Sequence, residues 1–171
     1  WELLGAGWSL AGVNADVIVR PLDNILLDRL IEGMREKFGM RVIARKEVAK
    51  KGIKTIKENR SLVFLVDQNT INSDVFVPFF GKLASAVTGP AIFARKMKCP
   101  VGFAYSVRES SNKHKLYYHP IDMDYSIKDR NEFIRVHTEK FTKLVEDVVR
   151  KHPEQWLWLH PRWKSRPKKN E

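Results

Sequence analysis

The sequence predicts an α/β protein in which a mainly parallel, mixed sheet is flanked by helices on both faces. Short apolar runs alternate along the chain with longer segments whose apolar residues recur every third or fourth position, the pattern of strands alternating with amphipathic helices. Such alternation favours parallel pairing, because each helix returns the chain to the same end of the sheet. No internal repeat, low-complexity block or interior linker interrupts it. We therefore expect a single domain over residues 1–171.

The first half of the chain is expected to contain three helices and three strands. Their predicted bounds are helices over residues 1–10, 24–38 and 46–59 and strands over residues 15–20, 41–44 and 61–66. Asp23 is a suitable N-cap for the second helix, and Gly39 is its expected stop. The third helix is basic and amphipathic, with its apolar residues directed inward. The uninterrupted apolar run at residues 61–66 predicts a central strand.

The second half of the chain opens with residues 67–85, which show no helical period and contain Pro78 and Gly81. A long ordered loop is predicted there, and a loop of about 15 residues or more inside a compact domain is usually functional. Thr88 is expected to open a helix that tolerates Pro90 in its first turn. The remaining expected elements are strands over residues 101–107 and 115–120 and a helix over residues 128–152.

The charge balance indicates an anionic partner. The chain has 31 Lys and Arg residues against 20 Asp and Glu residues, a formal net charge of +11. Nucleic acid, an anionic membrane surface and phosphorylated ligands are all compatible with an excess of that size. The single Cys99 excludes an internal disulfide and a zinc site built from cysteines. The longest clean apolar run, residues 62–66, is far shorter than the ~18 residues of a membrane-spanning helix.

Three polar residues follow predicted strands and are candidates for a ligand site. In an open α/β sheet, ligands bind beyond the carboxyl ends of the strands. Arg20 follows one strand, and Asp67 and Gln68 follow another. The carboxylate of Asp67 can orient a cation, a hydroxyl or a phosphate-binding Arg, or it can simply cap the loop. Arg20 is equally compatible with a weak surface pair to Asp16 or Asp23.

Five sequence blocks occur in order along nearly the whole chain. They are W-E-L from residue 1, R-P-L-D-N at residues 20–24, L-V-D-Q at 65–68, V-F-V-P-F-F-G at 75–81 and P-E-Q-W-L-W-L-H-P-R-W-K-S-R-P at 153–167. Together they resemble the bacterial lipid A biosynthesis acyltransferases, the lauroyl- or myristoyl-adding enzymes of the lysophospholipid acyltransferase superfamily.

The resemblance implies a membrane-bound enzyme that moves a fatty acyl chain from acyl carrier protein to a hydroxyl of a lipid A precursor, without a cofactor. The family's signature is a His followed five positions later by an acid, and Glu2 matches the acid. A lipid hydroxyl has too high a pKa to attack a thioester unaided, so the imidazole removes its proton. The His would be the fourth residue upstream of Trp1. We therefore expect a chain that lacks its N-terminal part, with the anchor and the catalytic His, and that is inactive as it stands.

The family's functional residues match particular positions of this chain. By resemblance, Glu2 is the acid of the dyad, Asp67 is an active-site acid, and Arg35 is a functional Arg suited to hold phosphate or a developing oxyanion. Arg35 is also compatible with an exposed charge at a helix end, beside Glu32 or Glu36. The candidates for substrate binding are Arg20, Asn24, Gln68, Phe79 and Phe80. The two Phe residues lie in an apolar segment that lines an acyl channel, touches lipid or packs into the core.

The partners implied by the resemblance are acyl carrier protein, a lipid A precursor and the anionic membrane surface, with this chain peripheral on the cytoplasmic face of the bacterial inner membrane. All three are acidic, which gives the +11 charge a specific explanation. The C-terminal tail combines Trp156, Trp158 and Trp163 with Arg162 and several lysines. It suits an interfacial contact, or it is a solvated basic tail with some core tryptophans.

Other functions stay open at this point. A related glycerolipid or glycolipid acyltransferase would share the mechanism, and a relative without the upstream His would bind lipid without catalysis. A nucleic-acid-binding domain is supported only by the charge and the aromatic residues, and no recognition motif is found, so no nucleic acid is expected. No metal site is expected either, and the oligomeric state is not indicated.

Overall fold

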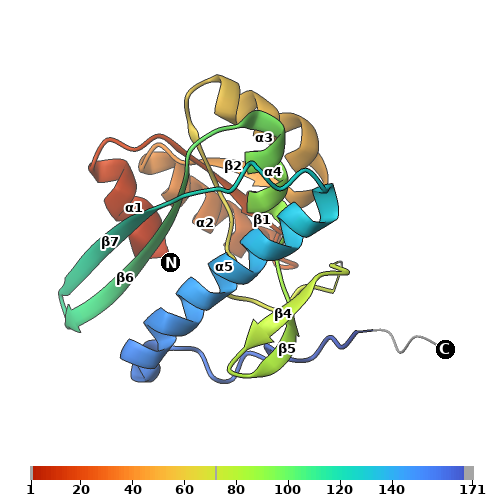
Figure 1. The fold of residues 1–171 in the computed structure, drawn as a ribbon. Helices are drawn as coiled ribbons and strands as arrows, with labels where there is room; N and C mark the ends of the chain where they lie inside the picture. Colours follow the sequence, from red (N-terminus) through yellow and green to blue (C-terminus); the bar gives the residue numbers. More distant parts are fainter. Residues whose placement is uncertain (1, 72, 168–171) are drawn as a thin grey trace. The chain divides into compact units, whose positions relative to one another are not determined.

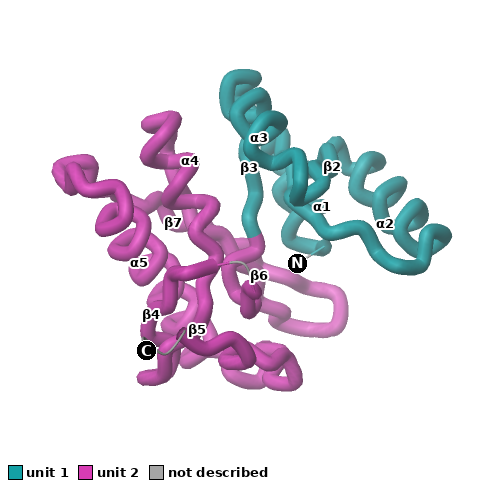
Figure 2. Tube along the Cα trace, turned by 90° about the vertical axis from the view of Figure 1, so that its right-hand side faces the viewer, with its two compact units in different colours: residues 1–64 teal, residues 65–171 magenta. Residues whose placement is uncertain are grey.

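A computed structural model describes residues 2–71 and 73–167 and divides the chain into two compact units, Trp1–Phe64 and Leu65–Glu171 (Figure 2). Figure 1 shows the helices and strands in chain order. The α/β class is confirmed, because a parallel sheet and its helices form the first unit, while helices and antiparallel hairpins form the second.

The first unit is built on a three-stranded parallel sheet in the order β2-β1-β3. Strand β1 (Ala15–Val19) is the middle strand, with β2 (Arg41–Ala44) on one side and β3 (Ser61–Val63) on the other. Val17 is paired with both Val42 and Val63, so valines from all three strands lie in one row. They pack with the buried residues Ala15 and Met40 into the core of this unit.

The predicted strand over residues 61–66 is wrong in its length and its position. Strand β3 ends at Val63, and β1 is the middle strand of the three. The apolar run continues to Val66, but its last residues leave the sheet where the chain passes from the first unit to the second. The residues of this run are only partly buried, and only the first part of the run forms strand.

The first unit has three α-helices. They are α1 (Glu2–Leu10), α2 (Ile25–Lys37) and α3 (Val48–Lys57), the last preceded by the short 3₁₀ helix η1 (Arg45–Glu47). Helix α1 precedes β1, α2 connects β1 with β2, and α3 connects β2 with β3. Asn24, and not the predicted Asp23, is the N-cap of α2, because its side-chain oxygen accepts hydrogen bonds from the backbone of Leu26 and Leu27. Gly39 follows that helix with φ of 77°, as its predicted role as a stop requires.

The second unit opens with a β-hairpin where a long loop was predicted. Strands β4 (Phe76–Phe79) and β5 (Lys82–Ser85) pair antiparallel around a two-residue turn at Phe80 and Gly81. Both turn residues have positive φ, 50° and 74°, which matches the twist of the two strands. Pro78 argued against a strand, but each strand of a two-stranded sheet has a free edge where a missing N–H is tolerated.

A second hairpin and two helices complete this unit. The elements are α4 (Gly89–Met97), β6 (Val101–Ser110), β7 (Lys113–Ile121), α5 (Arg130–Lys151) and η2 (Pro153–Gln155). Strands β6 and β7 are antiparallel, so parallel pairing in the described residues is confined to the first unit. Helix α5 buries Phe133, Phe141, Val145 and Val149 at helical spacing against β4, β5 and α4. None of the helices within the described ranges is long and apolar enough to span a membrane.

Candidate active site

Glu2 and Arg35, two residues predicted to be functional, lie together in the first unit. Arg35 donates from Nη2 to Glu2 Oε1 at 2.7 Å and from Nε to Glu2 Oε2 at 3.2 Å. The guanidinium therefore binds the carboxylate through two parallel hydrogen bonds, the arrangement that fixes both distance and orientation. The side chain of Arg35 is 10% exposed, while that of Glu2 is 43% exposed.

Local packing explains why the two residues meet. Glu2 begins α1, and Arg35 lies in the last turn of α2, after which the chain enters β2 through Met40. Gly5 permits α1 to approach Met40 closely, because a Cβ on that glycine would be 2.8 Å from the Met40 sulfur. The backbone of Met40 in turn donates to the carbonyl of Arg35 at 3.1 Å. Met40 thus links the first turns of α1 to the end of α2.

The pair has a geometry suited to orienting a base. Its two hydrogen bonds from Arg35 occupy one acceptor position on each oxygen of Glu2, and a carboxylate offers about four in all. The exposed side of Glu2 can therefore accept a further N–H, such as that of an imidazole. The alternative prediction for Arg35, an exposed charge at a helix end, is wrong, because Arg35 is buried.

Asp67 and Gln68 lie in the second unit, on the segment that leads from β3 toward β4. Asp67 is half-buried and Gln68 is exposed. The next residue, Asn69, is held by the C-terminal tail: its backbone N–H donates to His160 Nε2 at 2.9 Å, and its side-chain amide exchanges two hydrogen bonds with Ser165 at 3.1 and 3.2 Å. The tail therefore fixes the segment that carries the candidate acid.

Arg162 is a charged residue of this tail whose burial the sequence did not predict. It is 1% exposed, donates to the carbonyl oxygen of Ser85 and lies over the ring of Phe79 at 5.2 Å. Burial lowers the pKa of Arg162, and the negative charge of Asp67 acts in the opposite direction. Arg162 is therefore no part of a solvated or interfacial tail. No local pattern distinguished this arginine from its basic neighbours.

The tail tryptophans divide between core and surface. Trp156 and Trp163 pack around Phe79, with ring centroids 5.9 and 5.6 Å from its ring, whereas Trp158 is 54% exposed. Phe79 itself has no exposed surface. Phe80 is partly buried, and its backbone N–H donates to the carboxylate of Glu146 at 2.7 Å. Among the uses foreseen for this apolar segment, packing into the core is observed for Phe79, and an acyl-binding role for either Phe stays a prediction.

Arg20 and Asn24 make local contacts at the start of α2. Arg20 pairs with Asp23 at 3.2 Å, and both side chains are largely exposed, so of the two partners foreseen for Arg20 the structure selects Asp23. Asn24 caps the helix, as described above. Substrate binding by Arg20, Asn24 and Gln68 stays a prediction.

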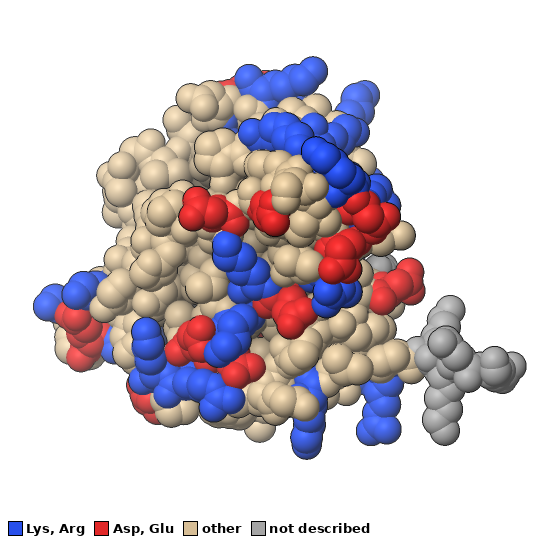
Figure 3. All heavy atoms as spheres, in the orientation of Figure 1, with Lys and Arg blue, Asp and Glu red and all other residues tan. Residues whose placement is uncertain are grey.

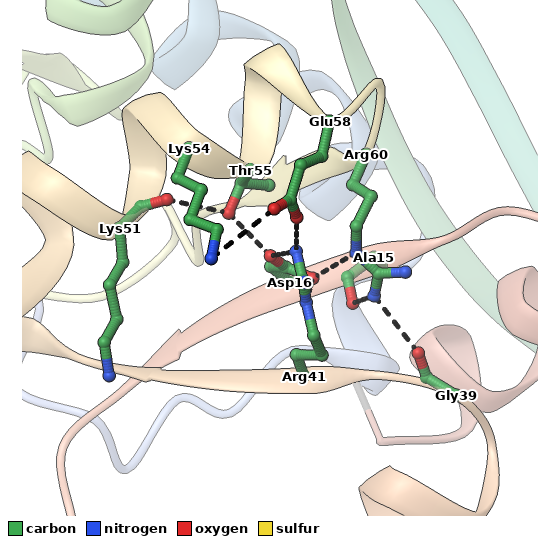
Figure 4. A network of polar contacts seen from close by, with 9 residues as sticks. All are labelled: Ala15, Asp16, Gly39, Arg41, Lys51, Lys54, Thr55, Glu58 and Arg60. Atoms are coloured by element: carbon green, nitrogen blue, oxygen red, sulfur yellow. Dashed lines mark hydrogen bonds and ion pairs between the residues drawn. The ribbon is translucent and has the colours of Figure 1, made fainter.

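Asp16, which was not predicted as a site residue, lies at the centre of the most extensive polar network of the first unit (Figure 4). Its carboxylate accepts from Arg41 at 2.9 and 2.6 Å, from Arg60 at 2.7 Å and from the hydroxyl of Thr55 at 2.6 Å. Burial alone would raise the pKa of Asp16, but these hydrogen bonds outweigh it and hold the pKa below its usual value. The sequence did carry a signal, since Asp16 is the one acid inside an apolar strand.

No group of three or more His, Cys, Asp and Glu residues is placed to hold a metal ion within the part of the chain that the structure describes. The first unit thus contains a carboxylate fixed by a buried arginine, and the second unit contains an acid on a segment held by the C-terminal tail.

Comparison with known proteins identifies the family. Residues 1–165 match the family model of the bacterial lipid A biosynthesis acyltransferases. The chain is also 29% identical over 153 residues to the lipid A biosynthesis lauroyltransferase of Escherichia coli (strain K12). That alignment covers 88% of this chain and 48% of the relative, so the chain spans about half the length of the curated relative it matches. With the family model covering nearly all of its residues, the chain belongs to the bacterial lipid A biosynthesis acyltransferase family.

Proposed function

We propose that this chain forms part of an enzyme that transfers a fatty acyl group from acyl carrier protein to a hydroxyl of a lipid A precursor. Family membership supports the reaction class, and the E. coli relative is a lauroyltransferase of lipid A biosynthesis. The single observation that carries the proposal is the bidentate contact between Glu2 and Arg35. It fixes the acid that the family signature requires.

The proposed step is an ester-forming attack. The acceptor hydroxyl oxygen bonds to the thioester carbonyl carbon while an imidazole, from the His expected four residues before Trp1, accepts the hydroxyl proton. The carbon–sulfur bond then breaks, and the proton passes to the departing thiolate of the carrier. Glu2 would accept a hydrogen bond from the imidazole and stabilise its charged form, while the two hydrogen bonds from Arg35 hold the carboxylate in a fixed orientation.

Asp67 is proposed as a further functional acid of the enzyme, on the basis of its match to the family. Its support in the structure is the fixed segment on which it lies, held through Asn69 by His160 and Ser165.

The enzyme would act at the cytoplasmic face of the inner membrane, where its acidic lipid acceptor and carrier protein would both be attracted by a chain of net charge +11.

Substitution of Glu2 tests the proposal. In the full-length protein, Glu2→Gln is expected to lower kcat for acyl transfer by roughly 10²–10⁴-fold, the usual contribution of oriented acid–base catalysis. The measurement is transfer of a labelled lauroyl group from acyl carrier protein to a lipid A precursor in mixed micelles. Glu36→Gln, an exposed acid on α2, is the matched control and should retain full activity. Full activity of Glu2→Gln would refute the dyad, because acyl transfer would then proceed without this carboxylate.

A further inference from the structure

Helix α3 and the residues that flank it carry a large share of the positive charge of the chain. Residues 45–60 contain seven Lys and Arg side chains and two Glu side chains, a net charge of +5 out of +11. In Figure 3, basic side chains gather at the top of the view, over α3. The lysines of this segment are all exposed, while Gly52 and Thr55 form the buried side of the helix. Such a concentration of charge on one element of a fold is the footprint of a binding surface.

The lysines are arranged as a row. Lys46 lies on η1, and Lys50, Lys54 and Lys57 follow at spacings of four, four and three residues, so the side chains share one face. At the rise of an α-helix, the row extends over about 16 Å. Lys51 lies beside the row and pairs with Glu47 at 2.9 Å, and Lys54 lies 3.6 Å from Glu58. For Lys46 and Lys50, no ion pair is found in the described part of the chain.

A groove of about 710 Å³ runs along this face. Four lysines line it, together with Val42 and Ile43 of β2, and its floor is the network around Asp16. Because Arg41 and Arg60 neutralise that carboxylate, the floor adds no free negative charge to oppose the lysines. Figure 4 shows the Lys51 side chain extending away from the network.

The same network makes the surface rigid. Thr55, in the last turn of α3, binds Asp16 on β1. Arg60, which follows α3, binds the same carboxylate and the backbone of Ala15 and Gly39. The lysine row is therefore presented on a helix whose position on the sheet is fixed by buried hydrogen bonds. A preorganised surface of this kind loses little entropy when a partner binds.

The composition of the face favours an acidic protein over a lipid surface. A helix that lies in a membrane interface places large apolar side chains beside its lysines. None of the described α3 residues is an exposed large apolar residue, whereas α2 exposes Leu26, Leu30 and Met34. Lysine is a flexible point charge that accelerates encounter and allows rapid release, which suits a donor that must bind and leave in every turnover.

We propose that α3 and its groove, defined by Lys46, Lys50, Lys51 and Lys54, form the docking surface for the acidic acyl carrier protein. This inference rests on the proposed function for the identity of the partner. It adds where on this chain the carrier protein would bind. The charged face of α3 is distinct from the Glu2–Arg35 pair, and no residue of that face takes part in the ester-forming step.

Charge reversal in the full-length protein tests the location. The double variant Lys46→Glu/Lys50→Glu should raise KM for lauroyl-acyl carrier protein roughly tenfold or more at low salt and leave kcat unchanged, because these residues act on encounter with the carrier. KM for lauroyl-N-acetylcysteamine, a donor without a protein, should stay the same. The matched control is Lys96→Glu/Lys128→Glu, two exposed lysines of the second unit that give the same change in net charge.

The difference in KM for lauroyl-acyl carrier protein between wild type and the Lys46→Glu/Lys50→Glu variant should also decrease as ionic strength rises from about 20 to 500 mM, because salt screens exposed charges. An unchanged KM for the carrier, or an equal rise in the control variant, would overturn the proposal. So would a loss of sedimentation with vesicles of anionic phospholipid at an unchanged KM for the carrier, since the lysine row would then be a membrane contact.

Direct binding separates this inference from the proposed function. Fluorescence anisotropy with labelled holo-acyl carrier protein reports docking even if no acyl transfer is detected. Binding by wild type that weakens about tenfold in the α3 variant supports the docking surface by itself. Transfer from the carrier with equal binding by both proteins would retain the proposed function and refute the surface.

Discussion

The first unit contains two contacts between a carboxylate and an arginine that are alike in geometry and opposite in burial. At Glu2 and Arg35, the arginine side chain is 10% exposed and the carboxylate 43% exposed. At Asp16 and Arg41, the carboxylate side chain is 2% exposed and the arginine 47% exposed. In each case the buried partner is fixed by the fold, and the exposed partner faces outward. This difference in burial indicates different roles for the two carboxylates.

Hydrogen-bond capacity leads to the same conclusion. Asp16 accepts four hydrogen bonds, which fills the acceptor positions of a carboxylate. All of its acceptor positions are used in contacts that hold β1, β2 and α3 together. Glu2 accepts two hydrogen bonds from Arg35 and keeps positions open on its exposed side. A carboxylate with its own fixed anchor and spare acceptor capacity is the one able to orient another group.

The largest effect on stability is expected from Asp16→Ala. Removing this carboxylate leaves Arg41, Arg60 and Thr55 without their shared acceptor, and breaking a buried ion pair from one side costs about 3–5 kcal/mol. Chemical denaturation followed by circular dichroism should show the loss. Asp23→Ala, which removes an exposed carboxylate paired with Arg20, should change the free energy of unfolding by less than about 1 kcal/mol. Equal effects of the two substitutions would contradict the contrast between buried and exposed carboxylates.

Acidification should remove the contribution of Asp16 to the free energy of unfolding over a defined pH range. The pKa of Asp16 in the folded chain lies below its usual value, because hydrogen bonds from Arg41, Thr55 and Arg60 outweigh the opposing effect of burial. The unfolded chain has the ordinary value of about 3.9. The stability that the ionised group contributes is thus fully present above about pH 4 and is lost as the pH falls through the lower folded value.

Denaturation of wild type and Asp16→Ala over a series of pH values measures this contribution. The difference in free energy of unfolding between the two proteins should be constant from about pH 7 to pH 5 and should decrease below about pH 4. A difference that grows on acidification would mean that the protonated form of Asp16 is the one that the fold stabilises.

The sequence predicted local elements better than contacts between them. Helices α1 to α5 and strands β1 and β2 follow from periodicity and from stop residues such as Gly39, because those signals act within a few residues. The hairpin of β4 and β5 was missed, since proline is unusual in a strand and an aromatic residue such as Phe80 is unusual at a turn position with positive φ. The break after Val63 was missed because an apolar run does not show where the backbone hydrogen bonds of a strand end.

The candidate site residues were selected one by one through the family blocks, and the sequence did not indicate which of them lie in contact. Glu2 and Arg35 are 33 positions apart, and no local pattern relates them. Asp16 could have been identified, because a lone acid in an apolar strand must find buried partners. The burial of Arg162 could not, since it depends on how the tail packs around Phe79 and the segment of Asp67.

Only a small effect on stability is expected at the residue whose loss should affect catalysis most. Glu2→Gln removes the charge of a carboxylate that is nearly half exposed, so the free energy of unfolding should change by no more than about 1 kcal/mol. Arg35 remains next to the amide oxygen of the new side chain, which can still accept one of its hydrogen bonds. Denaturation of Glu2→Gln and Asp16→Ala under the same conditions provides the comparison. A loss at Glu2 as large as that at Asp16 would make the Glu2–Arg35 pair a structural clamp, and the inactivity of Glu2→Gln would then reflect unfolding. A stable and inactive Glu2→Gln protein would instead separate catalysis from folding, because the fold would persist while the group that orients the base is gone.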